Sequence, residues 1–226
     1  MPGEEIKVMS SGSADPALGQ VARAFEAATG HKVNVTYDDK IIGEGGEAFD
    51  VIISSTNALA RRFRPAGAVE TGEVPIGRMG LGVAVRDGAP LPDVSGLEAF
   101  KGSLRALDGL VLTTHSSGFY MRDLLEEWGM GVEMSEKIEF FPDGPTSMQR
   151  LLKGTGRECT VLSLNQIQRY RGRGIALAGP LPEGAQLFRD FVAVPLIASR
   201  HKSVARAFSE FCGAEGLPIL AEAGFQ

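Results

Sequence analysis

The chain contains few of the residue types that form cross-links, metal sites or membrane spans. Its 226 residues include two cysteines, three histidines and one tryptophan. Cys159 and Cys212 are too far apart in sequence for a metal-binding knuckle, and no histidine cluster completes one. No apolar run approaches the ~20 residues of a transmembrane helix. We therefore expect no metal, no cofactor and no direct membrane insertion. Both thiols are expected to be buried and free, since a disulfide would need an oxidising compartment.

The chain also lacks a concentration of positive charge. Its formal net charge is −5, and its lysines and arginines are scattered along the sequence, so a nucleic-acid partner is not expected. The N-terminus, "MPGEEIKVMSS", has no basic start followed by an apolar stretch. The expected compartment is the periplasm if a signal was removed, and the cytoplasm if Met1 is native. Because 43% of the residues are hydrophobic, we expect a globular chain with a small-molecule partner.

Strands and helices are predicted to alternate from the N-terminus. The strand "IKVMS" precedes a helix in which Leu18, Val21 and Phe25 recur at helical spacing, and Gly30 suits the helix end. The strands "KVNVTY" and "FDVIIS" follow, and then a helix is predicted over 56–64. This alternation indicates an α/β protein with a mostly parallel sheet.

A second series of such units follows and predicts a second lobe. The strands "LGVAV", "GLVLTT", "KIEFF" and "CTVLS" are separated by helices predicted over 95–107, 118–128 and 145–153. Near the end, the strand "FVAVPLIAS" precedes a helix with an apolar face over 204–212. We expect the N-terminal segment and these C-terminal helices to share one lobe.

Four stretches resemble the molybdate-binding-like branch of the type 2 periplasmic solute-binding proteins. They are "IGRMGLGVAVRDGAPLPDVSGLEAFKGSL", "THSSGFYMRDLLEEWGM", "AGPLPEGAQ" and "SVARAFSEFCGAEGLPILAEAGF". The resemblance implies a two-lobed α/β fold of the type 2 periplasmic-binding-protein class, with the ligand cleft between the lobes. Lobe 1 would comprise residues 1–76 with 196–226, and lobe 2 residues 77–195.

The resemblance also implies how such a protein works. Members bind a small anion, mainly through backbone amides at helix starts and through serine hydroxyls, and close around it by hinge motion. They need no metal cofactor of their own. The implied partners are the small anionic ligand and an ABC-transporter membrane component, and the expected state is a monomer.

Two serine- and glycine-rich loops, one in each predicted lobe, follow strands and precede helices. The ordinary interpretation is helix capping by serine. Since the resemblance places ligand-binding groups here, we favour a ligand-binding role. The residues concerned are Ser11, Gly12 and Ser13 in the first lobe, and Ser116, Ser117 and Gly118 in the second.

Four further residues complete the predicted ligand-binding set: Tyr120, Thr146, Ser163 and Asn165. Thr146 and Asn165 suit helix capping equally well. Ser163 stands where relatives offer a tyrosine, which leaves room for a bulkier or differently hydrogen-bonding ligand.

The triplet Asp38, Asp39 and Lys40 is the main departure from the family pattern, because oxyanion-binding relatives are serine-rich at this position. A carboxylate near a compact dianion would be repelled by about 4 kcal/mol per charge pair at 4 Å and an effective dielectric of 20. Lys40 could instead pair with an organic carboxylate, and Asp38 or Asp39 could accept a hydrogen bond from a hydroxyl or take up a proton. The alternative is a solvated turn in which Lys40 neutralises its neighbours.

Two functional hypotheses follow. The first is an ABC-transporter-type solute-binding protein for a small anion, with an organic carboxylate favoured over molybdate or sulfate. The second is an enzyme on the same scaffold, because this branch is similar to aconitate isomerase, which moves a proton along an unsaturated tricarboxylate. Such chemistry needs a base that returns the proton and cations that hold the developing charge. The candidate catalytic residues are Lys40, Asp39 and His115.

Overall fold

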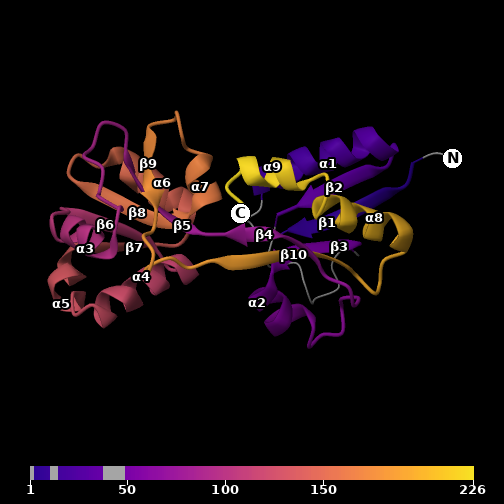
Figure 1. The fold of residues 1–226 in the computed structure, drawn as a ribbon, viewed down its shortest axis with the longest axis horizontal. Helices are drawn as coiled ribbons and strands as arrows, with labels where there is room; N and C mark the ends of the chain where they lie inside the picture. The colour runs from indigo at the N-terminus through magenta and orange to yellow at the C-terminus, as the bar shows by residue number, and fades with distance from the viewer. Residues whose placement is uncertain (1–2, 11–14, 38–48) are drawn as a thin grey trace. The chain divides into compact units, whose positions relative to one another are not determined.

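The computed structural model describes residues 3–10, 15–37 and 49–226. The chain forms two compact units (Figure 1): unit 1 comprises Met1–Met79 and Arg189–Gln226, and unit 2 comprises Gly80–Phe188. These boundaries differ from positions 76 and 195, at which the sequence places them. The reason is that strands β4 and β10 pair with each other as far as Met79 and Arg189, so hydrogen bonds hold both strands in unit 1.

Unit 1 is built on a five-stranded mixed sheet in the order β2-β1-β3-β10-β4. Strand β1 is parallel to β2 and β3, whereas β10 is antiparallel to β3 and β4. The sheet is therefore less parallel than predicted, because the chain re-enters unit 1 along β10. The strands are β1 (Glu5–Ser10), β2 (Lys32–Thr36), β3 (Val51–Ser55), β4 (Val74–Met79) and β10 (Arg189–Pro195).

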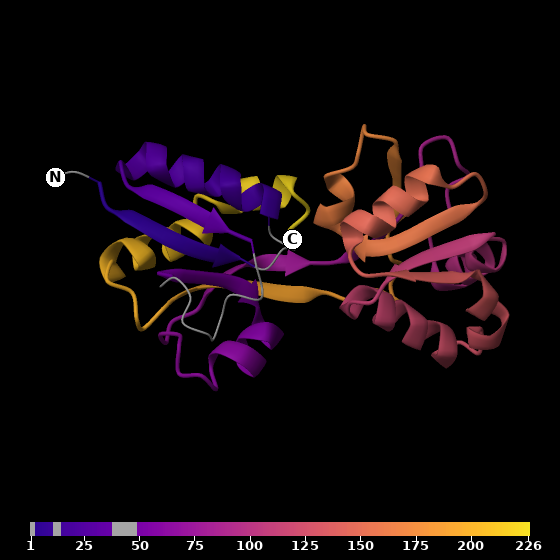
Figure 2. The same cartoon turned by 180° about the vertical axis from the view of Figure 1, so that it is seen from behind.

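Helices lie on both faces of this sheet (Figures 1 and 2). The helices are α1 (Asp15–Thr29), α2 (Thr56–Ala58), the π-helical η2 (Leu59–Phe63), α8 (Lys202–Cys212) and α9 (Leu217–Glu222). On one face, the buried Phe25 of α1 packs edge-on against Phe208 and Phe211 of α8 at centroid distances of 5.2 and 5.4 Å. On the other, Leu59 and Phe63 of η2 join a core cluster with residues of β1, β3 and β10. The N-terminal segment and the C-terminal helices thus belong to one unit.

Unit 2 has its own five-stranded sheet, in the order β7-β6-β8-β5-β9. Strand β6 is parallel to both β7 and β8, and β5 is antiparallel to β8 and β9. The strands are β5 (Leu81–Arg86), β6 (Gly109–Thr113), β7 (Ile138–Phe141), β8 (Glu158–Ser163) and β9 (Ile175–Pro180).

Successive side chains of the β6 strand divide the core of unit 2 into two layers. Leu110 and Leu112 pack with residues of α3, α4 and α5, whereas Val111 packs with residues of α6 and α7. The helices therefore cover both faces of the sheet, as expected for parallel strands. They are α3 (Leu97–Arg105), α4 (Ser116–Glu127), α5 (Gly131–Met134) with the 3-10 turn η3 (Ser135–Lys137), α6 (Gly144–Lys153) and α7 (Leu164–Gln168).

Both cysteines are buried and free, which confirms the prediction for Cys159 and Cys212. Burial raises the pKa of the Cys159 thiol to about 12 and also raises that of Cys212. Within the described ranges, no helix is both long and apolar enough to span a membrane.

Candidate functional site

Three helices of unit 2 begin at the same edge of its sheet. Strands β7, β6 and β8 are parallel neighbours, so their carboxyl ends at Phe141, Thr113 and Ser163 share that edge. Helices α6, α4 and α7 begin within a few residues of these strand ends. The first N–H groups of a helix have no partner inside the helix and carry partial positive charge. This edge therefore gathers hydrogen-bond donors that suit an anion.

The first turn of α4 is open. Its N-cap residue, His115, makes no side-chain capping bond, and the backbone carbonyl of His115 accepts from the N–H of Phe119, at 3.0 Å. Among the described residues, no group accepts from the N–H of Ser116, Ser117 or Gly118. A helix of 12 residues thus presents three unpaired donors at its positive end.

The serines of this turn differ in environment. Ser116 is exposed, whereas Ser117 is buried with its Oγ 3.3 Å from Oγ1 of Thr113. Gly118 is needed for the packing of α4 against the end of β6, because a Cβ here would lie only 2.0 Å from the carbonyl oxygen of Thr113. Gly118 thus allows α4 to approach the backbone of Thr113 closely.

The first turn of α6 is closed by a side chain. Oδ1 of Asp143 accepts from the N–H of Thr146 at 2.7 Å, and the Asp143 carbonyl accepts from the N–H of Ser147 at 3.1 Å. Hydrogen bonds from the hydroxyl and amide of Thr146 hold the pKa of Asp143 below its usual value. An electrostatic contribution from His115 acts in the same direction. The N–H of Thr146 is thus already bonded to the capping carboxylate of Asp143.

Two predicted residues lie where β8 passes into α7. Ser163 is buried and makes no side-chain capping bond. Asn165 is 2% exposed, and neither its Oδ1 nor its Nδ2 has a hydrogen-bond partner in the part of the chain that the structure describes. Leaving a buried polar group unpaired costs about 1–3 kcal/mol, so this amide requires an explanation.

Tyr120 is engaged within unit 2. Its hydroxyl donates to the carbonyl of Ala185 at 3.2 Å, and its ring packs against the core cluster that contains Leu110. Burial raises the pKa of the phenol above its usual value. Its contacts hold α4 to the segment before β10.

Five of the predicted site residues lie outside the described residues: Ser11, Gly12, Ser13, Asp39 and Lys40. Asp38 does so as well. In the neighbouring described residues of unit 1, Ser10 ends β1 in a fully buried position, and Ser55 caps α2 by accepting from the N–H of Ala58 at 3.3 Å.

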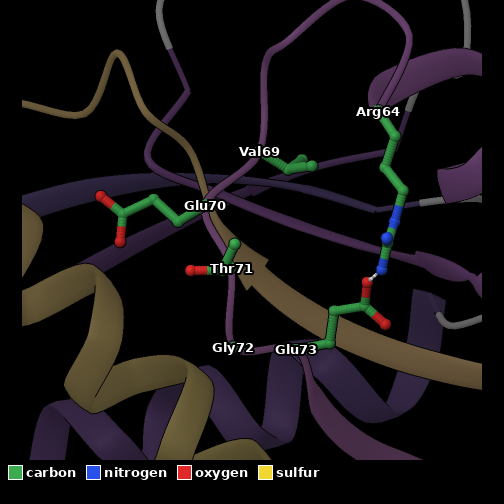
Figure 3. A pocket seen from close by; sticks show the side chains of 6 residues that line it. All are labelled: Arg64, Val69, Glu70, Thr71, Gly72 and Glu73. Carbon is green, nitrogen blue, oxygen red and sulfur yellow. Dashed lines mark ion pairs between the residues drawn. The ribbon is translucent and has the colours of Figure 1, made fainter.

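A surface pocket of about 370 Å³ lies elsewhere in unit 1, and Figure 3 shows its side chains. Arg64 forms an ion pair with Glu73 across it. Glu70 pairs with Lys202 at 3.1 Å and Arg206 at 3.2 Å, and the hydrogen bond from Lys202 is the main cause of its lowered pKa. Both carboxylates that line this pocket are therefore paired with cations. Its lining residues are Arg64, Val69, Glu70, Thr71, Gly72 and Glu73.

No group of three or more His, Cys, Asp or Glu side chains that could hold a metal ion occurs among the residues the structure describes.

Two residues at these helix starts were not predicted from the sequence: Asp143, at the closed start of α6, and Thr113, beside the open start of α4. A signal for Asp143 exists, because "DGPT" places an aspartate three residues before a threonine, with proline at the start of the helix. No comparable signal marks Thr113.

Comparison with known proteins defines the family. Residues 6–226 match the model of the bacterial extracellular solute-binding proteins, and the chain belongs to this family. It is 25% identical over 222 residues to an aconitate isomerase from a Pseudomonas species, covering 93% of this chain and 82% of that protein.

The fold is similar to that of solved anion-binding proteins. One is the periplasmic molybdate-binding protein of Azotobacter vinelandii, with a TM-score of 0.72, 17% identity and 98% coverage of both chains. Another is the sulfate-binding protein SubI of Mycobacterium tuberculosis, with a TM-score of 0.74, 19% identity, and coverage of 98% of this chain and 86% of that one. The predicted α/β fold of the type 2 periplasmic-binding-protein class is confirmed.

Proposed function

We propose that this solute-binding protein binds a small anion, with an organic carboxylate preferred over molybdate or sulfate. The observation that supports it most is the open first turn of α4, where the N–H groups of Ser116, Ser117 and Gly118 have no partner among the described residues. Unpaired donors at the positive end of a helix favour an anion. The molybdate- and sulfate-binding proteins of similar fold support the anionic class.

Acidic residues support the preference for an organic carboxylate. Asp143 caps the neighbouring helix start with an ionised carboxylate. A compact dianion close to this group would be repelled by about 4 kcal/mol per charge pair at 4 Å and an effective dielectric of 20. A carboxylate ligand carries a single charge on each of its separated groups, and so it can turn its charge to α4 and a neutral part to Asp143. From the sequence, Asp39 would add a second acidic group, and Lys40 would supply a cation for a second carboxylate of the ligand.

The ligand set also includes the remaining predicted residues as proposals. Ser11, Gly12 and Ser13 would supply amides and a hydroxyl, and Ser163 would supply a further hydroxyl. The protein would deliver its ligand to the membrane component of an ABC transporter.

An isomerase is the second candidate, and the similarity to aconitate isomerase favours it. An allylic proton shift needs one group that removes a proton and returns it to another carbon. His115 stands at the open end of α4, where it is the N-cap residue of the helix. The open amides of α4 would hold the developing negative charge, and Lys40 and Asp39 remain candidates from the sequence.

A calorimetric ligand screen tests the proposal. Titrating the chain with succinate, citrate, cis-aconitate, sulfate and molybdate should give binding of at least one carboxylate and weaker binding of both oxyanions. Tight binding of molybdate or sulfate alone would refute the carboxylate preference. The absorbance of cis-aconitate over time then separates the two candidates, since a constant signal in the presence of bound ligand indicates a binding protein and a decay indicates an isomerase.

A further inference from the structure

The carboxamide of Asn165 is buried and has no hydrogen-bond partner within the described ranges. Asn165 is 2% exposed, and both Oδ1 and Nδ2 are without a bond. An asparagine side chain offers two donors and one oxygen acceptor with two lone pairs. Nearly all buried polar side chains in proteins are bonded to protein or water, so a site that leaves both ends of an amide unpaired is prepared for another molecule.

Asn165 lies at the same edge of the sheet as the proposed anion site. It follows β8, and α4 with its open first turn follows β6, the parallel neighbour of β8. Both α4 and α7 contact β8. The next residue, Gln166, reaches the start of α6, since its Oε1 would lie 3.2 Å from a Cβ placed on Gly144. The start of α7 therefore borders the other helix starts of this edge.

We propose that Asn165 makes the site selective for an anion that also carries a hydroxyl or an acidic proton, such as a hydroxycarboxylate. This inference rests on the proposed function. Nδ2 donates to an oxygen of the anion and Oδ1 accepts from the ligand hydroxyl. An anion that only accepts, such as sulfate or a carboxylate without a hydroxyl, leaves Oδ1 unpaired. A site built to bond a hydroxyl rejects the analogue that lacks it far more strongly than an apolar site does.

A matched pair of probes isolates this hydroxyl. Citrate and tricarballylate differ only by the hydroxyl on the central carbon. Calorimetric titration of the chain should give a citrate dissociation constant lower than that of tricarballylate by about tenfold or more. In Asn165→Leu, which has a similar volume and no polar atoms, the ratio should fall towards one.

The matched control is Thr160→Val. Thr160 lies within β8, is fully buried, and its Oγ1 also has no partner among the residues that are described. Without ligand, both variants should melt at the wild-type temperature or a few degrees above it, because each removes an unpaired buried group. Only Asn165→Leu should lose the preference for citrate.

Each outcome has a separate meaning. If carboxylates bind but citrate and tricarballylate bind equally to the wild type, or the preference survives in Asn165→Leu, the role of Asn165 is refuted and the proposed function stands. If no carboxylate binds the wild type, the proposed function fails and the inference fails with it. Should Asn165→Leu not fold, Asn165→Ala replaces it. This variant also removes both ends of the amide, so the ratio should again fall towards one, and an unchanged ratio would refute the role.

Discussion

Substitution of Gly118 by alanine tests how α4 is seated on the end of β6. A glycine inside an exposed helix normally costs about 0.5–1 kcal/mol relative to alanine, so helix propensity alone predicts stabilisation. The structure predicts the opposite, because the added Cβ would lie 2.0 Å from the carbonyl oxygen of Thr113 and 2.7 Å from its nitrogen. Both atoms belong to the backbone and cannot rotate away. The helix would have to move by more than about 1 Å to restore an ordinary contact.

The expected loss of stability is the cost of overpacking less the gain in helix propensity. Overpacking a well-packed site costs about 1–3 kcal/mol and occasionally more. We expect Gly118→Ala to lower the free energy of unfolding by about 2–3 kcal/mol, and the apparent melting temperature by about 4–12 °C for a chain of this size. Since the start of α4 would shift, binding of the anion should weaken as well.

Gly102→Ala is the matched control for this experiment. Gly102 lies in α3, is exposed, and a Cβ added there would meet no atom within 4 Å. This variant should be more stable than the wild type by about 0.5–1 kcal/mol. Thermal unfolding followed by circular dichroism measures both variants. Equal stability of Gly118→Ala and Gly102→Ala would refute the close packing of α4 on Thr113.

Three further predictions concern single side chains. Gln186 accepts from the N–H groups of Leu81 (2.7 Å) and Leu187 (3.0 Å) and donates to two carbonyls, so in urea unfolding Gln186→Leu should lower the free energy of unfolding by about 2–4 kcal/mol. The control Gln20→Leu, at an exposed position, should change it by no more than about 0.5 kcal/mol, and equal losses in the two variants would contradict this. The depressed pKa of Asp143 stabilises the fold above the unfolded-state pKa of about 3.9, and this contribution is lost as the pH falls through the folded-state pKa. Asp143→Ala should therefore lower the free energy of unfolding by about 1 kcal/mol at pH 7 and by less at pH 3. An equal loss at both pH values would contradict the stabilising role of the ionised carboxylate. Lys40→Met should weaken carboxylate binding, measured by calorimetry, by about 1.5–3 kcal/mol without lowering the melting temperature. A change in binding free energy near zero would indicate that Lys40 forms only an exposed ion pair.

The sequence predicts the elements whose signal is local, and misses those that depend on distant partners. The helical periodicity of Leu18, Val21 and Phe25 gives α1, and Gly30 ends it with a φ of 76°. Strands β4 and β9 were not predicted, because each contains glycine and proline and is defined by antiparallel pairing with a distant strand. Their glycines, Gly77 and Gly179, have positive φ where the register shifts.

The helix predicted over 56–64 is divided into α2 and the π-helical η2. The apolar spacing of Leu59 and Phe63 is compatible with either form, and both residues pack against residues of β3 and β10. Local propensity carries no information on this choice.

The helix starts of the candidate site were predictable, because serine- and glycine-rich loops between strands and helices mark helix starts. The sequence could not show which starts are open. "THSSG" and "DGPTS" look alike as polar loops, yet His115 leaves its helix uncapped while Asp143 closes the next one. Nor could it show that Gly118 serves helix packing, or that the amide of Asn165 has no partner among the described residues, since both depend on contacts with other segments.

The most direct test of the central claim is to follow the backbone amides of α4 during a ligand titration. In ¹⁵N-labelled protein, the NMR signals of Ser116, Ser117 and Gly118 should shift as citrate is added, and should saturate at the dissociation constant that calorimetry gives. The amide of Thr146, which Asp143 already occupies at 2.7 Å, should shift much less. Binding of citrate that leaves these three amides unchanged, or that moves the Thr146 amide most, would contradict the assignment of the anion to the open turn of α4.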